Sequence, residues 1–204
     1  MKLIKFFFVL FAFSSFGQGT FYGNHVIDVY GGLPNMDKYF ANVLNTNNQT
    51  ISSYKGLPPS GIRYSFMLND NISLGLDVIY NYNTKVYLDT DTSYVNGNWQ
   101  YTNIETTNRE KRLRIQARMN FFLSNNIPEF DSYFGIGIGT NNRWIKKYQD
   151  NNLVQTLKGG EAALLPFSMR VCYGIRYYFS YNFGLNAEVG LGGPLLSFGL
   201  SYKI

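Results

Sequence analysis

Residues 111–122 read KRLRIQARMNFF, and apolar and polar side chains alternate along the whole segment. Every odd position from Leu113 to Phe121 is apolar, and every even position from Arg112 to Asn120 is Arg, Gln or Asn. A helix would scatter these two sets around its axis, whereas a strand separates them onto two faces. The segment is therefore predicted to be a β-strand with one apolar face and one strongly polar face.

The same alternation recurs in seven further segments, most of them long enough to cross a bilayer as tilted strands, which takes about 9–11 residues. An even number of such strands is typical of a bacterial membrane barrel, with one face in lipid and the other in the lumen. The sequence thus predicts an all-β fold, a membrane-spanning antiparallel up-and-down β-barrel of about eight strands. The eight predicted strands are residues 24–32, 60–68, 72–83, 111–122, 132–140, 164–177, 183–191 and 196–204.

The connections between these strands alternate between short and long. Residues 69–71, 124–131 and 180–182 are short turns, while residues 33–59, 84–110 and 141–163 are long and polar. Outer-membrane barrels have short periplasmic turns and longer outer loops. With the N-terminus on the periplasmic side, the three long connections face outward as polar loops or as extensions of the strands, and only the outer connection at residues 192–194 is short.

The first residues, MKLIKFFFVLFAFSSFGQ, have the three regions of a secretory signal peptide. Lys2 and Lys5 precede an apolar run over residues 6–13, and the small residues Ser15 and Gly17 follow it. The apolar run is shorter than the roughly 20 residues that a membrane helix needs. We therefore expect a signal peptide at residues 1–17 and one barrel domain at residues 18–204.

The composition narrows the classes of function. Hydrophobic residues make up 45% of the chain, aromatic residues 18% and charged residues 15%. The formal net charge of +5 is spread along the sequence, whereas a nucleic-acid-binding protein usually gathers its basic residues in a patch or stripe. The chain has one cysteine, Cys172, and one histidine, His25, which are too few for an internal disulfide or a structural zinc site. We expect no metal and no cofactor.

The C-terminal residues 190–204, GLGGPLLSFGLSYKI, resemble the closing strand of small outer-membrane β-barrel domain proteins of the Bacteroidetes type. The signal ending SFGQ, residues 15–18, looks similar as well, and the whole architecture resembles OmpX/OmpA-type eight-stranded barrels. The alternating apolar residues of the last strand resemble the signal that the barrel-assembly machinery reads. That signal usually ends in an aromatic residue, whereas this chain ends in Ile204 with Tyr202 nearby. The resemblance implies a place in the outer membrane of a Gram-negative bacterium and implies no activity.

Candidate functional residues gather on the predicted lumen face. One interpretation is a plug of ion pairs, because an eight-stranded barrel is just wide enough for its own side chains and buried Arg needs carboxylate partners. The other is an anion-selective constriction or anion site. The predicted cluster comprises Arg63, Arg112, Arg114, Arg118, Arg170, Arg176, Asp28, Asp77 and Glu188.

Other residues have simpler interpretations. His25, which a lipid-modifying enzyme could use as a base, is predicted to point outward beside apolar neighbours. Cys172 is predicted to fill space inside the barrel. The run Gly135, Gly137 and Gly139 is predicted to make room for bulky lumen side chains. Tyrosines near strand ends are predicted to form interfacial aromatic girdles, namely Tyr22, Tyr80, Tyr82, Tyr133, Tyr177, Tyr178 and Tyr202.

Four functions remain open from the sequence. The favoured one is a non-enzymatic, porin-like surface protein that anchors its long loops for a structural, adhesive or surface-interaction role. The alternatives are a small anion-preferring channel or transporter, a lipid-modifying enzyme that uses His25, and a soluble lipocalin-like barrel with its apolar face turned inward. The expected partners are outer-membrane lipid, lipopolysaccharide and the barrel-assembly machinery, with no nucleic acid; the sequence names no external ligand.

Overall fold

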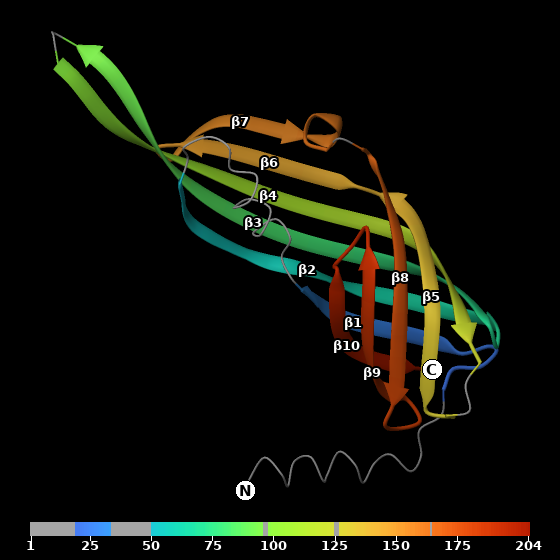
Figure 1. The fold of residues 1–204 in the computed structure, drawn as a ribbon. Coiled ribbons are helices and arrows are strands. Elements are labelled where there is room, and N and C mark those ends of the chain that lie inside the picture. Colours follow the sequence, from blue (N-terminus) through green and yellow to red (C-terminus); the bar gives the residue numbers. More distant parts are fainter. Residues whose placement is uncertain (1–18, 34–49, 96–97, 125–126, 164) are drawn as a thin grey trace, which may run out of the picture.

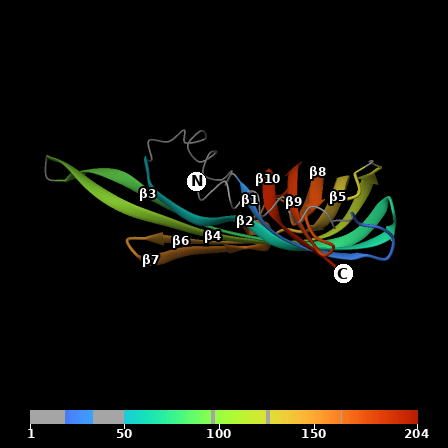
Figure 2. The ribbon, with the colours of Figure 1, turned by 90° about the horizontal axis from the view of Figure 1, so that it is seen from below.

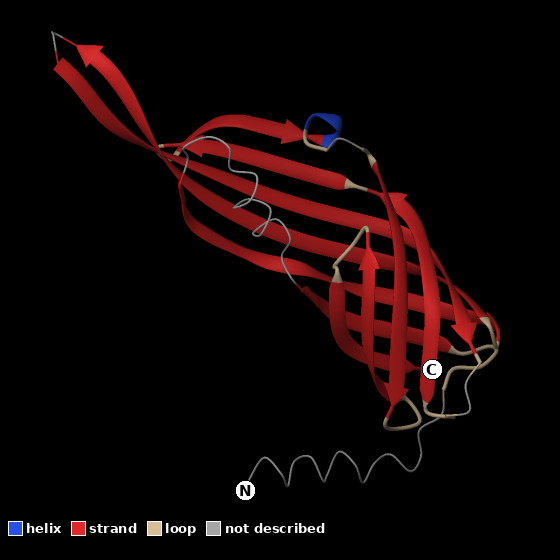
Figure 3. Ribbon diagram, in the orientation of Figure 1, coloured by secondary structure: helices blue, strands red, loops and turns tan. Residues whose placement is uncertain are grey.

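The computed structural model describes residues 19–33, 50–95, 98–124, 127–163 and 165–204 of the chain. Almost all of this part is strand, in one antiparallel sheet, with one short 3-10 helix at Gly159–Glu161 (Figures 1 and 3). The predicted signal peptide and residues 34–49 of the first long connection lie outside the described residues. In the part that is described, no helix is both long enough and apolar enough to cross a membrane.

Eight of the described strands close into a barrel, because each pairs antiparallel with the next and β1 pairs with β10. The predicted all-β, eight-stranded antiparallel barrel is confirmed. Several strand boundaries differ from the predicted ones. Strand β8, for example, begins after Pro166 rather than at residue 164, since proline cannot donate to a strand ladder. The barrel strands are β1 (His25–Leu33), β2 (Thr50–Asn69), β3 (Ile72–Val95), β4 (Asn98–Leu123), β5 (Phe130–Thr140), β8 (Phe167–Tyr178), β9 (Phe183–Leu191) and β10 (Leu196–Lys203).

The barrel wall is much taller on one side than on the other. Strands β3 and β4 have 24 and 26 residues, whereas β9 and β10 have 9 and 8. Two further strands, β6 (Asn142–Gln149) and β7 (Asn152–Lys158), add to the tall side by pairing β4 with β6 and β6 with β7. We call this projecting part, residues 50–59, 84–95, 98–110 and 142–158, the sheet extension. Figure 2 shows it reaching away from β8, β9 and β10.

The sheet extension occupies sequence that we expected to form polar loops or extensions of the strands. The structure shows extended strands, together with the added strands β6 and β7, so the expectation of loops is corrected for most of this sequence. Strands β3 and β4 stay paired without a register shift from Ile72↔Phe121 to Val95↔Asn98. Their outer halves are rich in Thr and aromatic residues, which favour a pleated strand even when they are not alternately apolar. Strands β6 and β7 meet in a two-residue turn at Asp150 and Asn151, whose φ values of 47° and 65° suit a tight hairpin.

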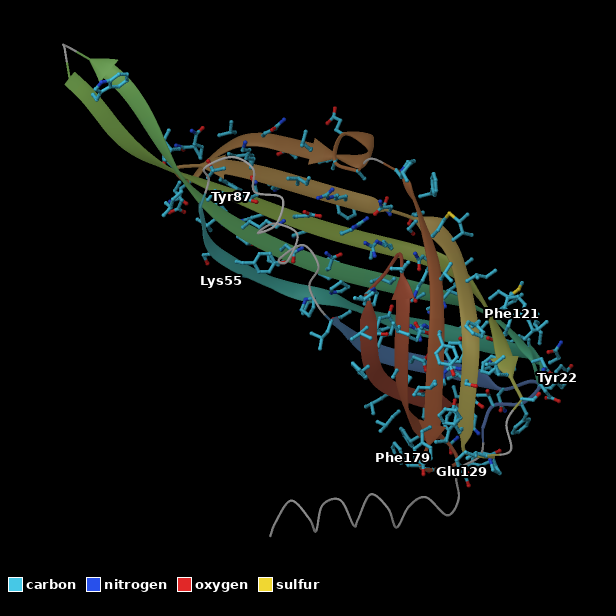
Figure 4. The ribbon with its side chains drawn as sticks, viewed as in Figure 1. Tyr22, Lys55, Tyr87, Phe121, Glu129 and Phe179 are labelled. Atoms are coloured by element: carbon cyan, nitrogen blue, oxygen red, sulfur yellow. The ribbon has the colours of Figure 1, made fainter. Side chains whose placement is uncertain are left out.

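The two ends of the barrel differ in their connections. The end of β10 lies beside the start of β1, where His25 and Ile204 exchange backbone hydrogen bonds. Figure 4 places Tyr22, Glu129 and Phe179 at this end, and Lys55 and Tyr87 on the sheet extension. The short turns after β2, β4 and β8 lie at the end that carries the terminus of β10, and the longest strands project from the other end (Figure 1). The predicted asymmetry between the two ends is therefore present, with strands in place of loops.

The barrel has a polar interior and an apolar exterior, the inverse of a water-soluble domain. Buried polar or charged side chains outnumber buried apolar ones among the described residues. Exposed Leu, Ile, Val, Phe and Met side chains cover the outer face of the barrel strands, and we call this surface the apolar belt. It includes Val29, Ile62, Leu76, Ile115, Ile136, Met169, Val171, Leu185 and Leu200.

Candidate functional site in the barrel lumen

Strand pairing brings charged residues from distant parts of the sequence to one level of the lumen. Asp28 on β1 lies opposite Arg63 on β2, and Arg63 lies opposite Asp77 on β3. Because side chains alternate between the two faces of a strand, these residues share the inner face with Arg118 on β4 and Glu188 on β9. All five are buried, so their charges are neutralised by one another rather than by bulk water.

Glu188 is the main acceptor of the lumen. Its carboxylate accepts from Arg63 at 2.8 Å, from Arg118 at 2.8 Å and from Arg170 at 2.9 Å. The hydroxyl of Tyr133 donates to the same carboxylate at 2.8 Å. Hydrogen bonds between ionised groups are stronger than neutral ones, and a planar guanidinium can donate twice to one carboxylate. Glu188, on β9, therefore links its own strand to β2, β4, β5 and β8.

Asp28 and Asp77 complete the same cluster. Asp28 pairs with Arg63 at 3.1 Å and with Arg176 at 2.8 Å, and the hydroxyl of Ser201 donates to it at 2.6 Å. Asp77 pairs with Arg118 at 3.0 Å and with Arg63 at 3.5 Å. Arg63 thus contacts all three carboxylates of the cluster, so the ion pairs form one connected network rather than isolated bridges.

Glycine in the neighbouring strands provides the space that this network occupies. A Cβ atom at Gly135 would lie 2.7 Å from Arg118 Nη2 and from Cys172 Sγ. A Cβ atom at Gly174 would lie 2.6 Å from Tyr133 Oη, the group that donates to Glu188. Both distances are below van der Waals contact, so a larger residue at either position would displace a side chain of the network.

The structure joins seven of the nine predicted lumen residues in this network, which we call the lumen cluster: Asp28, Asp77, Glu188, Arg63, Arg118, Arg170 and Arg176. The remaining two lie nearer the end from which the sheet extension projects. Arg114 is buried and donates to the carbonyl of Gly192 at 3.3 Å, and Arg112 is half-buried and donates to Asn141 Oδ1 at 2.7 Å.

Tyrosine hydroxyls belong to the lumen as well, and the predicted cluster did not include them. Tyr30 donates to Asp77 at 2.5 Å, and Arg63 lies over the Tyr30 ring at 4.6 Å. Tyr133 and Tyr178, which we expected in an aromatic girdle, are fully buried inside the barrel. The signal was available, because Tyr133 has the same parity as Gly135, and Tyr178 has the same parity as Arg176. Both tyrosines were assigned to the girdle because they lie near strand ends. The alternation of side chains along a strand is the stronger constraint on which face a residue occupies.

His25 and Cys172 lie on opposite faces of the barrel wall. His25 Nδ1 lies 2.6 Å from the Tyr64 hydroxyl on the outer face, where its ring also packs 4.8 Å from Phe66. The buried carboxylates lie on the opposite face of the same wall. Cys172 is buried in the lumen, where its sulfur accepts from Arg118 at 3.2 Å. Among the described residues, no group of His, Cys, Asp and Glu is arranged to hold a metal ion.

The arrangement fills the middle of the lumen with side chains. The side chains of the lumen cluster are 0–1% exposed in every one of its ion pairs. The four guanidinium groups exceed the three carboxylates by one charge, so the closed centre of the barrel keeps a small positive excess. With Arg inside and the apolar belt outside, the chain does not have the inward apolar face that a lipocalin-like barrel requires, and that alternative is wrong for this fold.

Fold and site together define the chain as a closed eight-stranded antiparallel β-barrel with an ion-paired lumen. It is similar to the crystal structure of the N-terminal β-barrel domain of OprF from Pseudomonas aeruginosa, with a TM-score of 0.46 and 11% sequence identity. The match covers 91% of this chain and 100% of that chain. No protein-family model matches the sequence, and no curated protein matches it. The likeness to Bacteroidetes-type barrel proteins stays a prediction.

Proposed function

We propose that the protein is a non-enzymatic integral outer-membrane protein in which the barrel is an anchor and the sheet extension is the part that interacts outside the cell. The observation that carries this proposal is the inversion of polarity around a closed lumen, because a continuous apolar exterior is stable in lipid and unfavourable in water. A closed barrel also satisfies its backbone hydrogen bonds within the bilayer.

The direction of insertion follows from the two unequal ends of the barrel. Bacterial barrels carry their short turns on the periplasmic side and their long connections outside. The sheet extension then stands above the outer leaflet, and outer-membrane lipid and lipopolysaccharide surround the apolar belt. The barrel-assembly machinery would insert such a chain. A structural, adhesive or surface-interaction role fits a stiff sheet of paired strands held above the membrane.

Surface labelling of cells that express the protein tests this arrangement. Leu153→Cys, on β7, and Tyr181→Cys, in the turn after β8, replace side chains of similar exposure, 55% and 53%. We expect a membrane-impermeant maleimide to label Leu153→Cys in intact cells and to label Tyr181→Cys only after the outer membrane is opened. The native Cys172 is buried and serves as the unlabelled background. Equal labelling of the two positions in intact cells, or the reverse order, would contradict the proposal.

A further inference from the structure

A second cluster of charged residues lies away from the lumen, on the outer face where the barrel wall continues into the sheet extension. Strands β3, β4, β6 and β7 form a groove of about 530 Å³ there. Its lining combines four cationic side chains with four aromatic ones and contains no carboxylate. We call this lining the cationic groove: Tyr80, Tyr82, Arg109, Lys111, Trp144, Lys146, Tyr148, Thr156 and Lys158.

The strand register arranges these side chains in two adjacent rows across the sheet. Lys111 on β4 lies opposite Tyr82 on β3 and opposite Trp144 on β6, and Trp144 lies opposite Lys158 on β7. The next row along β4 places Arg109 directly opposite Lys146. Neighbouring strands are about 4.8 Å apart. Lys111, Arg109 and Lys146 therefore lie on two adjacent strands, and Lys158 lies one strand further on.

The pair of Arg109 and Lys146 points to a ligand. Like charges directly opposite each other destabilise a sheet, and a bound anion between them would relieve the repulsion. The acidic residue nearest in sequence does not do so, because Glu110 faces the other side of β4 and pairs with Arg143 at 2.6 Å. Arg109 also lies over the Tyr148 ring at 4.7 Å, a contact that holds its guanidinium in place on this face.

The cationic groove begins where the apolar belt ends. Along the outer face of β4, apolar residues run from Phe121 to Leu113, and the next residue on that face is Lys111. Eight residues of strand span about 27 Å, which a tilt of about 35–45° reduces to about 19–22 Å, slightly less than the apolar band of a membrane barrel, about 25 Å. Trp144 and Tyr80 lie at this same boundary, the level at which aromatic residues contact lipid headgroups.

From this position and charge we infer that the cationic groove binds the phosphorylated headgroup of an outer-leaflet glycolipid, whose acyl chains pack on the apolar belt below. The inference rests on the proposed insertion in the outer membrane. Lysine ammonium groups and an arginine provide direct contacts to phosphate, while Trp144 and the tyrosines provide flat faces for a sugar ring or acyl stem.

Binding is measured with the full-length mature protein folded in detergent micelles, with lipid A as the probe. The chain has two Trp residues, so the Trp99→Phe variant leaves Trp144 in the groove as the single fluorescent reporter. In this background the test variant is Lys111→Gln/Lys146→Gln. The matched control is Lys85→Gln/Lys147→Gln, which removes two lysines from the opposite face of the same sheet extension. The heat-dependent shift in gel mobility verifies that each variant is folded.

We expect the test variant to bind lipid A about 25-fold more weakly, since each basic residue near an anionic lipid surface contributes about fivefold. The control variant should bind lipid A like the parent protein. The parent protein should bind dephosphorylated lipid A as weakly as the test variant binds lipid A. Inorganic phosphate should compete only poorly. Equal affinity of the test and control variants, or undiminished binding of dephosphorylated lipid A, would overturn the inference. Full competition by inorganic phosphate would overturn the lipid assignment in favour of a soluble anion. Because the assay uses micelles, these outcomes are independent of the surface labelling in cells.

Discussion

Replacing Glu188 by glutamine is expected to lower the free energy of unfolding by about 3–5 kcal/mol, the cost of removing one partner from a buried ion-pair network. Glu188 accepts from Arg63, Arg118 and Arg170 at 2.8–2.9 Å. Glutamine keeps the shape of the side chain but loses the charge, so four buried guanidinium groups would face two carboxylates. Desolvated positive charge without a counterion is what makes this change costly.

The measurement is urea unfolding of the protein in lipid vesicles, followed by circular dichroism and by the gel shift of the folded barrel. Glu161→Gln is the matched control, because it removes the same charge from an exposed position in the 3-10 helix and should change stability by less than about 0.5 kcal/mol. Adding Arg170→Met to Glu188→Gln removes one of the uncompensated charges, so the double variant should be less destabilised than the two single effects predict. A loss below about 1 kcal/mol for Glu188→Gln would show that the lumen cluster is solvated like a surface ion pair.

The second large effect concerns the apolar belt. Val171→Arg is expected to destabilise the protein in vesicles by about 2–4 kcal/mol, the cost of a cationic side chain on the lipid face of a barrel near the bilayer midplane. Val171 lies opposite Ile136 on β5, close to the middle of both strands. The side chain is 60% exposed, so a steric clash with the protein does not account for the loss.

Val154→Arg is the control for this experiment. Val154 on β7 is 59% exposed, nearly the same as Val171, but it belongs to the sheet extension. If the sheet extension stands in water, the substitution should change the free energy of unfolding by less than about 0.5 kcal/mol. Equal effects of the two substitutions in vesicles would mean that the apolar belt does not contact lipid.

The sequence predicted the barrel well because alternation is a local property with strong consequences. In β4, the alternation over Arg112–Asn120 places five polar side chains on one face. A shift of the strand register by one residue would point all five outward, away from the lumen. Parity also predicted that Asp28, Asp77 and Glu188 share the lumen with Arg63. Their pairing depends on the closure of β1 on β10 and on contacts across the lumen, which no local pattern contains.

The sheet extension was harder to predict for a physical reason. Strands β6 and β7 have both faces open, with every residue half-buried or exposed, so no apolar face marks their period. The burial of a face is what normally makes strand alternation visible in a sequence. The cationic groove shares this difficulty, since Arg109 and Lys158 are 49 positions apart in sequence and line the same groove only through the order of β4, β6 and β7.

We propose that the chain is a membrane-embedded barrel whose lumen is closed by its own ion pairs, and single-channel recording in a planar lipid bilayer tests this most directly. The mature protein, verified as folded and inserted, is predicted to show no steady conductance, because the cluster around Glu188 fills the lumen. A steady, anion-selective conductance that changes on substitution of Arg114 or Arg118 would contradict a closed lumen and would instead support the function of a small anion-preferring channel.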